Sequence, residues 1–468
     1  MARRRAERVV GMGDGLPATS VSERLASRIL ALDAGNLPSA LRIKCEDLLV
    51  DVTGLCVAAR NEDYVQAALA GLDDDGPCTA IGHARTLTAG DAAFVNGTAA
   101  HGEDFDDTFE GGPVHAGAVV VPAVLAACER YRADGAAALL GIAVGAEVMC
   151  RLSTVTPKAV HKAGFHPTAI FGVMGAAAGV GAALRLNAGQ IVDALGIAGS
   201  FASGIIEYLA EGAWTKRLHP GWAAQSGLRA ALLARGGFRG PRTVFEGVHG
   251  LFYGFAHTTQ GDFDALTGDF GTCWVTETLA FKPYPCGTMA HPYIDCARRL
   301  AARGIKPDDV KEMVCEVGEG TVHRLWEPLA SKQRPPNGYA AKFSTPFIIA
   351  SGFVRGGVGL EAFTDEAVRD PDVLALAAKV RYAVDPDNPY PKAFTGHIRA
   401  VLNDGRVVEE RQPHFRGGAH EPLTRAEIEE KFALNTRYGG WDDARTRAAL
   451  GVLVRLYDGE MNLRGLRG

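Results

Sequence analysis

Apolar residues recur at intervals of three and four over most of the chain between residues 21 and 260, as on one face of an α-helix. Ser22 can cap the first such helix, and Pro38 is predicted at the first position of the second. Further helices are predicted at 92–103, 116–132, 135–153, 168–186, 188–200 and 222–235. Many of them are apolar on most sides, so we expect them at the centre of a large helical bundle.

The pattern changes near residue 272, where short segments typical of strands begin. Strands are predicted at 275–281, 310–317, 379–384 and 397–402, with helical patterns between them at 290–303 and 344–352. The tail is helical again, since Thr424 and Glu427 form a capping-box pattern and 442–456 has helical spacing. We therefore expect a mainly α protein with an α+β insert. Its parts are a flexible lead-in at 1–20, a helical domain at 21–271, an α+β domain at 272–413 and a helical return at 414–468.

The composition is that of a folded protein, with 47% hydrophobic and 22% charged residues among 468. A chain of this length favours two or three domains. The net charge of −5 argues against a general nucleic-acid binder, because such proteins carry a basic excess. The nine cysteines are scattered without a CxxC pair, which argues against a disulfide framework, a zinc ribbon or an iron–sulfur cluster.

No segment predicts a membrane span or an export signal. The longest apolar run, 116–128, is too short to cross a bilayer, and no apolar stretch follows the basic start. We therefore expect a cytoplasmic protein without a membrane partner, with organelle targeting by the N-terminal arginines as the alternative.

An acidic segment with two histidines is the first candidate for chemistry. His101 is followed within six residues by Glu103, Asp104, Asp106 and Asp107, and His115 comes later. In a helix, Asp104 would lie one turn from both His101 and Thr108. A carboxylate beside a histidine fixes its tautomer and raises its pKa, which suits acid–base catalysis, and the same groups can ligate a metal. The alternative is a solvated acidic helix end.

Three further segments place basic or imidazole groups beside apolar helices. Gly164-Phe165-His166-Pro167-Thr168 opens an apolar helix, where His166 faces the domain centre or serves only as a cap. Trp214 to Gly221 brings Lys216, Arg217 and His219 together, which suits an anionic ligand or a solvated loop. Lys282 stands at a strand end before two prolines, where it can bind a carboxylate, act as a base, or merely end the strand.

The glycine-rich segment from Gly175 to Gly181 is not a dinucleotide fingerprint, because no strand precedes it. Close packing of helices accounts for it better. No Walker loop or GxSxG elbow is present in the sequence.

Taken in order, the four chemical segments resemble the MmgE/PrpD family, which includes 2-methylcitrate dehydratase and cis-aconitate decarboxylase. The resemblance rests on NGTAAHGEDFDDT, GFHPT, WTKRLHPGWAAQSGLRAALLARGGF and KPYPCGTMAHPYID, with support from AKFSTPF and PLTRAEIEEKF. It covers roughly residues 20–455. It implies a helical domain built from both chain ends, an inserted α/β domain, a homodimer, and activity without a metal or an organic cofactor.

The resemblance also implies site residues. The family's active-site positions fall on Asp104, Thr108, His115, His166, Lys216 and Lys282, and His101 and Arg217 are further candidates for binding the substrate. This chain departs from the family at residue 116, where Ala116 follows His115 and the family commonly has proline.

The resulting hypothesis is a cofactor-free lyase that acts on a small di- or tricarboxylate in a cationic pocket. Lys216, Arg217 and Lys282 would hold carboxylates. His166 or His115 would move a proton beside one of them, while Asp104 and Thr108 orient the group. Dehydration, decarboxylation, isomerisation and epimerisation of a dicarboxylate such as iminodisuccinate all need these parts. Two other classes stay open: a helical protein that binds carboxylates without turnover, and a metal hydrolase with His101, Asp104 and Asp106 as ligands.

Overall fold

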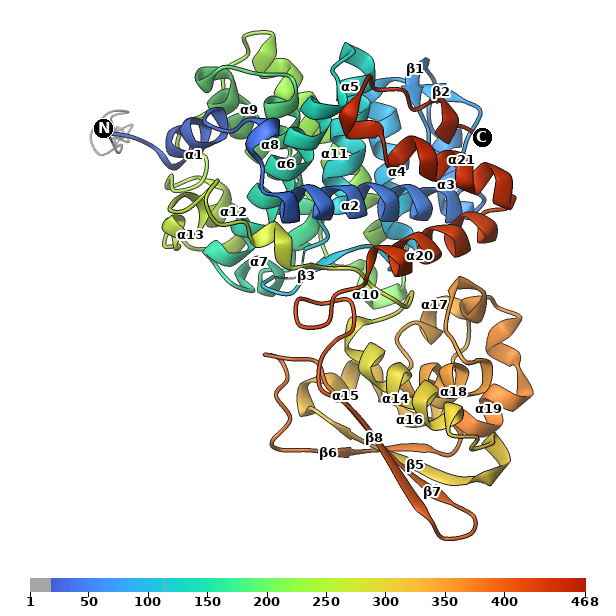
Figure 1. Cartoon of the computed structure of the whole chain (residues 1–468). Helices are drawn as coiled ribbons and strands as arrows, with labels where there is room; N and C mark the ends of the chain where they lie inside the picture. Colours follow the sequence, from blue (N-terminus) through green and yellow to red (C-terminus); the bar gives the residue numbers. More distant parts are fainter. Residues whose placement is uncertain (1–17, 113) are drawn as a thin grey trace, which may run out of the picture.

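The computed structural model describes residues 18–112 and 114–468, and it confirms the predicted fold class of a mainly α protein with an α+β part. The lead-in predicted at 1–20 lies almost entirely outside the described residues. Figure 1 shows a large helical domain and, below it in the view, a smaller α+β domain. One buried apolar core combines residues 21–281 with 428–466, and a second spans 284–402. The domain boundaries at residues 272 and 413 stay a proposal, although residues 274–281 pack in the first core.

The helical domain is built around α8, every residue of which is buried. Helices α6 and α11 pack against α8, and α4, α5 and α9 surround this centre. Its helices are α1 (Val21–Leu30), α2 (Ser39–Ala58), α3 (Asp63–Ala70), α4 (Ala89–Gly102), α5 (Gly117–Tyr131), α6 (Gly135–Val155), α7 (Ala159–Lys162), α8 (Pro167–Ala183), α9 (Ala188–Phe201), α10 (Tyr208–Glu211), α11 (Thr215–Arg235), α12 (Leu251–Ala256) and α13 (Phe263–Thr267). Two short antiparallel pairs accompany them, β1 (Asp75–Thr79) with β2 (Thr86–Leu87) and β3 (Thr108–Phe109) with β4 (Leu279–Ala280).

Glycines let α6 and α8 approach closely, as the sequence predicts. A Cβ atom on Gly175 would lie 2.7 Å from the carbonyl oxygen of Gly145, and one on Gly179 would lie 2.6 Å from that of Gly141. Helix α6 is long and apolar enough to cross a membrane, but 89% of that stretch is buried inside the fold. It is therefore packed as a core helix.

The α+β domain contains a four-stranded sheet in the order β6-β5-β7-β8. Strand β5 runs parallel to β6 and antiparallel to β7, and β7 and β8 are antiparallel. Helix α14 packs on β7 and β8, and α18 packs on α14 and β6. The elements are α14 (His291–Ala302), β5 (Val310–Val317), α15 (Glu319–Leu325), α16 (Leu329–Gln333), α17 (Gly338–Ala341), α18 (Thr345–Arg355), α19 (Pro371–Ala377), β6 (Val380–Val384), β7 (Gly396–Leu402) and β8 (Val407–Gln412).

The C-terminal helices α20 (Arg425–Tyr438) and α21 (Asp443–Leu453) return to the helical domain, where α20 packs along α2 (Figure 1). The predicted capping box is confirmed: the Thr424 side chain accepts from the Glu427 amide, and the Glu427 carboxylate accepts from the Thr424 amide. The cap predicted at Ser22 is wrong, because Ser20 and Glu23 form that reciprocal pair and Ser22 lies inside α1.

Two other predictions of local structure need correction. The strand predicted at 275–281 is a 3₁₀ helix at Val275–Thr278 followed by the short strand β4, and β8 was not predicted. The helix predicted at 222–235 begins at Thr215, so Lys216 and Arg217 belong to α11 and do not lie in a loop.

The contact between α6 and α8 yields a stability prediction. Gly175→Ala should lower the free energy of unfolding by about 1–3 kcal/mol, because the added methyl group overlaps backbone and the Met149 side chain. Gly254→Ala in α12 is the matched control, since its Cβ atom would meet nothing within 4 Å. Thermal or urea unfolding measures both variants. Equal stability of the two would contradict the packing described here.

Candidate active site

The acidic segment is a turn and does not continue the helix. Helix α4 ends at Gly102, and Asp104 adopts a left-handed backbone conformation with φ of 58°. Thr108 lies in β3, opposite Ala280 of β4. The condition of a helical segment is therefore not met, and Asp104 and Thr108 are not one helical turn apart. The turn instead directs Asp104 toward lysines from two other segments.

Asp104 is a buried carboxylate held by two ammonium groups. Its Oδ1 atom lies 2.8 Å from Nζ of Lys216 in the first turn of α11 and 3.3 Å from Nζ of Lys282 just after β4. Burial alone would raise the pKa of Asp104, but the charges of Lys216 and Lys282 bring it well below its ordinary value. Burial would lower the pKa of Lys216, and Asp104 raises it instead. These groups therefore stay charged, which makes Lys216 an anion holder and not a base.

Four histidines lie beside Asp104, Lys216 and Lys282: His101, His115, His166 and His219. Nδ1 of His101 lies 2.7 Å from Oδ2 of Asp106, and Nδ1 of His166 lies 3.1 Å from Nδ1 of His219. The ring of His101 is 4.9 Å from that of His115 and 5.7 Å from that of His166, between ring centroids. The sequence-predicted residues His101, His115 and His166 thus form one cluster.

The hydrogen bonds of His115 define its tautomer. Its Nδ1 atom lies 2.6 Å from the carbonyl oxygen of Asp107, which can only accept, so Nδ1 donates and Nε2 keeps a free lone pair. Burial lowers the pKa of His115 to about 3. Burial and the neighbouring His101 also hold the pKa of His166 well below its ordinary value. Both imidazoles are therefore neutral, and the rise in pKa expected from a neighbouring carboxylate is outweighed by burial.

The departure at Ala116 has a structural role. Its backbone N–H donates to Oδ2 of Asp107 at 2.9 Å, and the N–H of Gly117 donates to Oδ1 at 2.9 Å. Proline at position 116 could not make the first of these bonds. Ala116 therefore adds a second donor for the Asp107 carboxylate at the start of α5.

Thr108 and Arg217 are placed less directly. Within the described residues, the Thr108 hydroxyl makes no hydrogen bond to the cluster, although pairing with Ala280 puts Thr108 near the segment that carries Lys282. The Arg217 guanidinium lies over the rings of Tyr64 and Tyr339, at 4.4 and 5.0 Å. Arg217 is thus held between aromatic faces.

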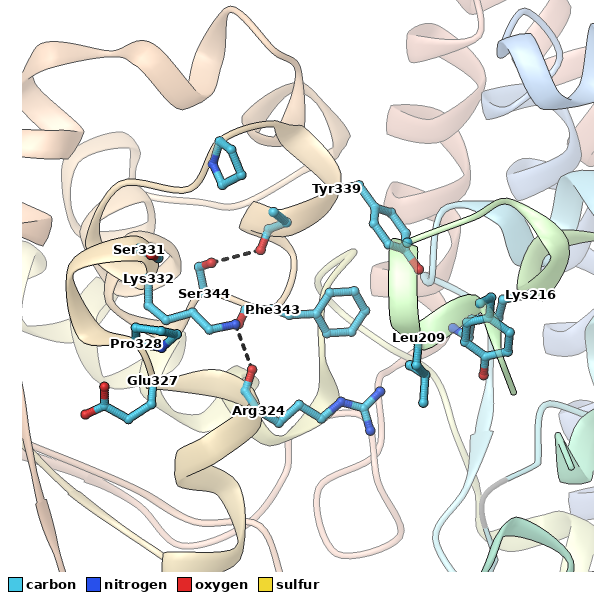
Figure 2. A pocket seen from close by; sticks show the side chains of 14 residues that line it. Leu209, Lys216, Arg324, Glu327, Pro328, Ser331, Lys332, Tyr339, Phe343 and Ser344 are labelled. Atoms are coloured by element: carbon cyan, nitrogen blue, oxygen red, sulfur yellow. Dashed lines mark hydrogen bonds between the residues drawn. The ribbon is translucent and has the colours of Figure 1, made fainter. Parts of the chain in front are cut away.

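A cavity of about 350 Å³ opens between the two domains next to Lys216. The helical domain contributes Tyr208, Leu209 and Lys216, and the α+β domain contributes Arg324, Lys332, Tyr339, Phe343 and Ser344 among others (Figure 2). Sequence reasoning missed Tyr208, Arg324 and Tyr339, because no local pattern marks them. His219, which the sequence groups with Lys216 and Arg217, lies three residues after Lys216 in α11 and contacts His166.

The structure does not assemble the metal ligands suggested by the sequence. The set of His101, Asp104 and Asp106 fails because Asp104 pairs with two lysines. His101, Asp106 and His115 do place one ligand atom each within 4.8 Å of one another. This trio is the set that could hold an ion within the part of the chain that the structure describes.

The fold and the site define a two-domain protein with a buried acid–base cluster at the domain junction, and comparison with known proteins identifies its family. Residues 23–264 match the MmgE/PrpD N-terminal domain and residues 284–453 match the MmgE/PrpD C-terminal domain, so the chain belongs to the MmgE/PrpD family, as the sequence motifs predict.

Curated relatives include cis-aconitate decarboxylases. The chain is 26% identical over 445 residues to the cis-aconitate decarboxylase-like protein oryM of Aspergillus oryzae, covering 90% of this chain and 91% of the relative. It is 29% identical over 364 residues to the cis-aconitate decarboxylase of Homo sapiens (75% and 73%) and 27% identical over 431 residues to that of Aspergillus terreus (86% of each). The homodimer and the cytoplasmic location expected from the sequence stay predictions.

The buried imidazoles predict a pH-dependent stability. Burial lowers the pKa of His219 to about 4 in the fold, so between pH 6.5 and 4 the unfolded chain binds more protons at this residue than the folded chain. Its contribution to stability must therefore fall as the pH falls. Relative to His219→Gln, the wild type should lose up to about 1.4 kcal/mol of unfolding free energy per pH unit in this window. Urea unfolding at several pH values measures the difference, and a difference independent of pH would refute it.

Proposed function

We propose that the protein is a lyase that acts on a small di- or tricarboxylate by general acid–base catalysis. The observation that carries the proposal is the meeting of two buried ammonium groups and two neutral imidazoles around Asp104, with Lys216 also lining the cavity. Fixed positive charges suit a carboxylate, and neutral imidazoles suit proton transfer at the neighbouring carbon. Membership of a family with cis-aconitate decarboxylase relatives supports this class.

Decarboxylation of an unsaturated tricarboxylate is the reaction we place first. The bond between a carbon and one carboxylate breaks, carbon dioxide leaves, and the electron pair moves toward the unsaturated carboxylate that Lys216 and Lys282 would hold. A proton carried by His115 or His166 then goes to the carbon. Because both imidazoles are neutral in the empty site, the proton must arrive with the substrate or from water before this step.

Dehydration of a hydroxytricarboxylate such as 2-methylcitrate uses the same groups in the opposite order. An imidazole takes a proton from the carbon beside a carboxylate, and hydroxide leaves with a second proton as water. The free Nε2 lone pair of His115 suits the first step. The two reactions differ in the bond that breaks and share the cationic pocket.

Mass spectrometry of the purified, chelator-treated protein in deuterated buffer tests the function. The substrates are cis-aconitate, 2-methylcitrate, citrate and iminodisuccinate. We expect loss of carbon dioxide or water from one of them, and a fall in kcat/KM of about 10²-fold or more in Lys216→Met. Lys311→Met, at an exposed lysine of β5, is the control and should keep full activity.

Each other outcome decides against part of the proposal. Deuterium uptake without net loss of mass would replace the lyase with an isomerase or epimerase. Binding without turnover would replace it with a carboxylate-binding protein. A loss of activity on chelation, restored by one metal, would point to the ion-binding trio of His101, Asp106 and His115.

We expect Arg324 to bind the substrate carboxylate that lies farthest from Lys216. Its guanidinium reaches into the cavity toward Leu209 (Figure 2), and within the described residues no carboxylate forms an ion pair with it. Loss of one charged hydrogen bond of about 1.5–3 kcal/mol corresponds to a roughly 10- to 150-fold weaker affinity. Arg324→Gln should therefore raise KM for a tricarboxylate by about that factor and change kcat little.

Steady-state kinetics measures this effect, with Arg334→Gln, at an exposed arginine just after α16, as the control. A substrate that lacks the distal carboxylate should lose nothing when Arg324 is replaced. An equal rise in KM for both kinds of substrate would refute the assignment.

A further inference from the structure

Three consecutive backbone carbonyls in the Asp104 turn each accept a hydrogen bond from a different buried lysine. Nζ of Lys342 lies 2.8 Å from the Glu103 oxygen, Nζ of Lys282 lies 2.9 Å from that of Asp104, and Nζ of Lys431 lies 2.7 Å from that of Phe105. Lys342 directly follows α17, Lys282 lies in the segment after β4, and Lys431 lies in α20. The turn is thus held from three directions.

Each of these lysines also contacts a carboxylate. Lys342 pairs with Glu103 at 2.5 Å, Lys282 with Asp104 at 3.3 Å, and Lys431 with Asp51 at 2.7 Å. No more than 7% of any of the three lysine side chains is exposed. Burying an ammonium group is costly unless its hydrogen bonds are satisfied, so these lysines are not incidental surface charges.

The backbone that they hold is in a conformation that non-glycine residues rarely adopt. Asp104 has φ of 58°, and such a residue persists only when its surroundings fix it. Hydrogen bonds to the carbonyls before, at and after Asp104 supply that constraint. They also fix the direction of the Asp104 side chain toward Lys216.

Lys342 connects this turn to the cavity wall. It follows α17 directly and stands between Tyr339 and the pair Phe343 and Ser344, all of which line the cavity. Lys431 acts from the opposite side, with its ammonium group 3.9 Å from the centre of the Phe105 ring. The turn therefore joins a wall of the α+β domain to a helix of the helical domain.

We propose that Lys342 and Lys431 are positioning residues, which hold the turn at Glu103 and Phe105 so that the Asp104 carboxylate stays between Lys216 and Lys282. Lys342 thereby couples the cavity wall at residues 339–344 to the acid–base cluster. Neither lysine lines the cavity at Lys216, so they act through Asp104 and not on the substrate. The catalytic consequence rests on the proposed function, whereas the effect on the turn does not.

Crystal structures of Lys342→Met and Lys431→Met test the effect on the turn without any assay. We expect Asp104 to leave its left-handed conformation or its contact with Lys216 to lengthen from 2.8 Å. Lys379→Met is the matched control, because Lys379 also donates to two backbone carbonyls, those of Pro307 and Val310, but lies away from the turn. An unchanged turn in both test variants would overturn the proposal, whether or not the wild type is a lyase.

Kinetics tests the coupling once a substrate is known. Lys342→Met should lower kcat by about tenfold or more, as small misplacements of catalytic groups do, with KM changed by less than about threefold. In an Asp104→Asn background the same substitution should have little further effect, because the group through which it acts is gone. Multiplicative losses in the double variant would indicate a merely structural role and overturn the coupling. Should Lys342→Met fail to fold, Lys342→Arg and Lys431→Gln enter the same cycle.

Discussion

The ion triplet of Asp104, Lys216 and Lys282 is the constraint on which the rest of the site depends. One carboxylate and two ammonium groups are buried together, and each would be unstable there alone. Their charges fix the protonation state of Asp104, and they surround the imidazoles with positive charge that favours the neutral form. Burial is the main cause of the neutral histidines, and the charges that would hold a carboxylate add to it.

The triplet also explains the path of the chain. Lys216 comes from the first turn of α11, Lys282 follows β4 at the exit from the helical core, and Asp104 follows α4. Three segments far apart in sequence must meet to within hydrogen-bonding distance. The glycine-mediated contact of α6 with α8 and the burial of all of α8 give the helical domain the rigidity that this meeting requires.

Much of this could be predicted from local patterns, and the failures have local causes. Strand β5 has its predicted bounds, because residues 310–317 alternate in polarity on a half-buried sheet. The helix predicted at 92–103 ends at Gly102, and the left-handed conformation of Asp104 beyond it has no mark in the local pattern. Helix α11 begins earlier than predicted, since Pro220 lies inside it and hides the helical pattern.

The cavity residues of the α+β domain could not be predicted from the sequence, for a different reason. Arg324 and Tyr339 reach the site only through the docking of the two domains, and neither stands in a segment with a distinctive spacing. Lys342 and Lys431 stand in the motifs AKFSTPF and PLTRAEIEEKF, but neither motif indicates that its lysine binds the turn around Asp104. Such long-range contacts depend on tertiary structure alone.

The two walls of the cavity belong to different domains, and this division bears on how the protein could diversify. The helical domain carries the acid–base cluster, whereas α15, α16 and α17 carry the opposite wall. Side chains on α15 and α16 can change in size and charge without altering the packing of α8 or the ion pairs of Asp104, whereas α17 is tied to the Asp104 turn through Lys342. A new substrate range would therefore arise most readily by exchange of this peripheral segment, with the proton-transfer apparatus inherited unchanged.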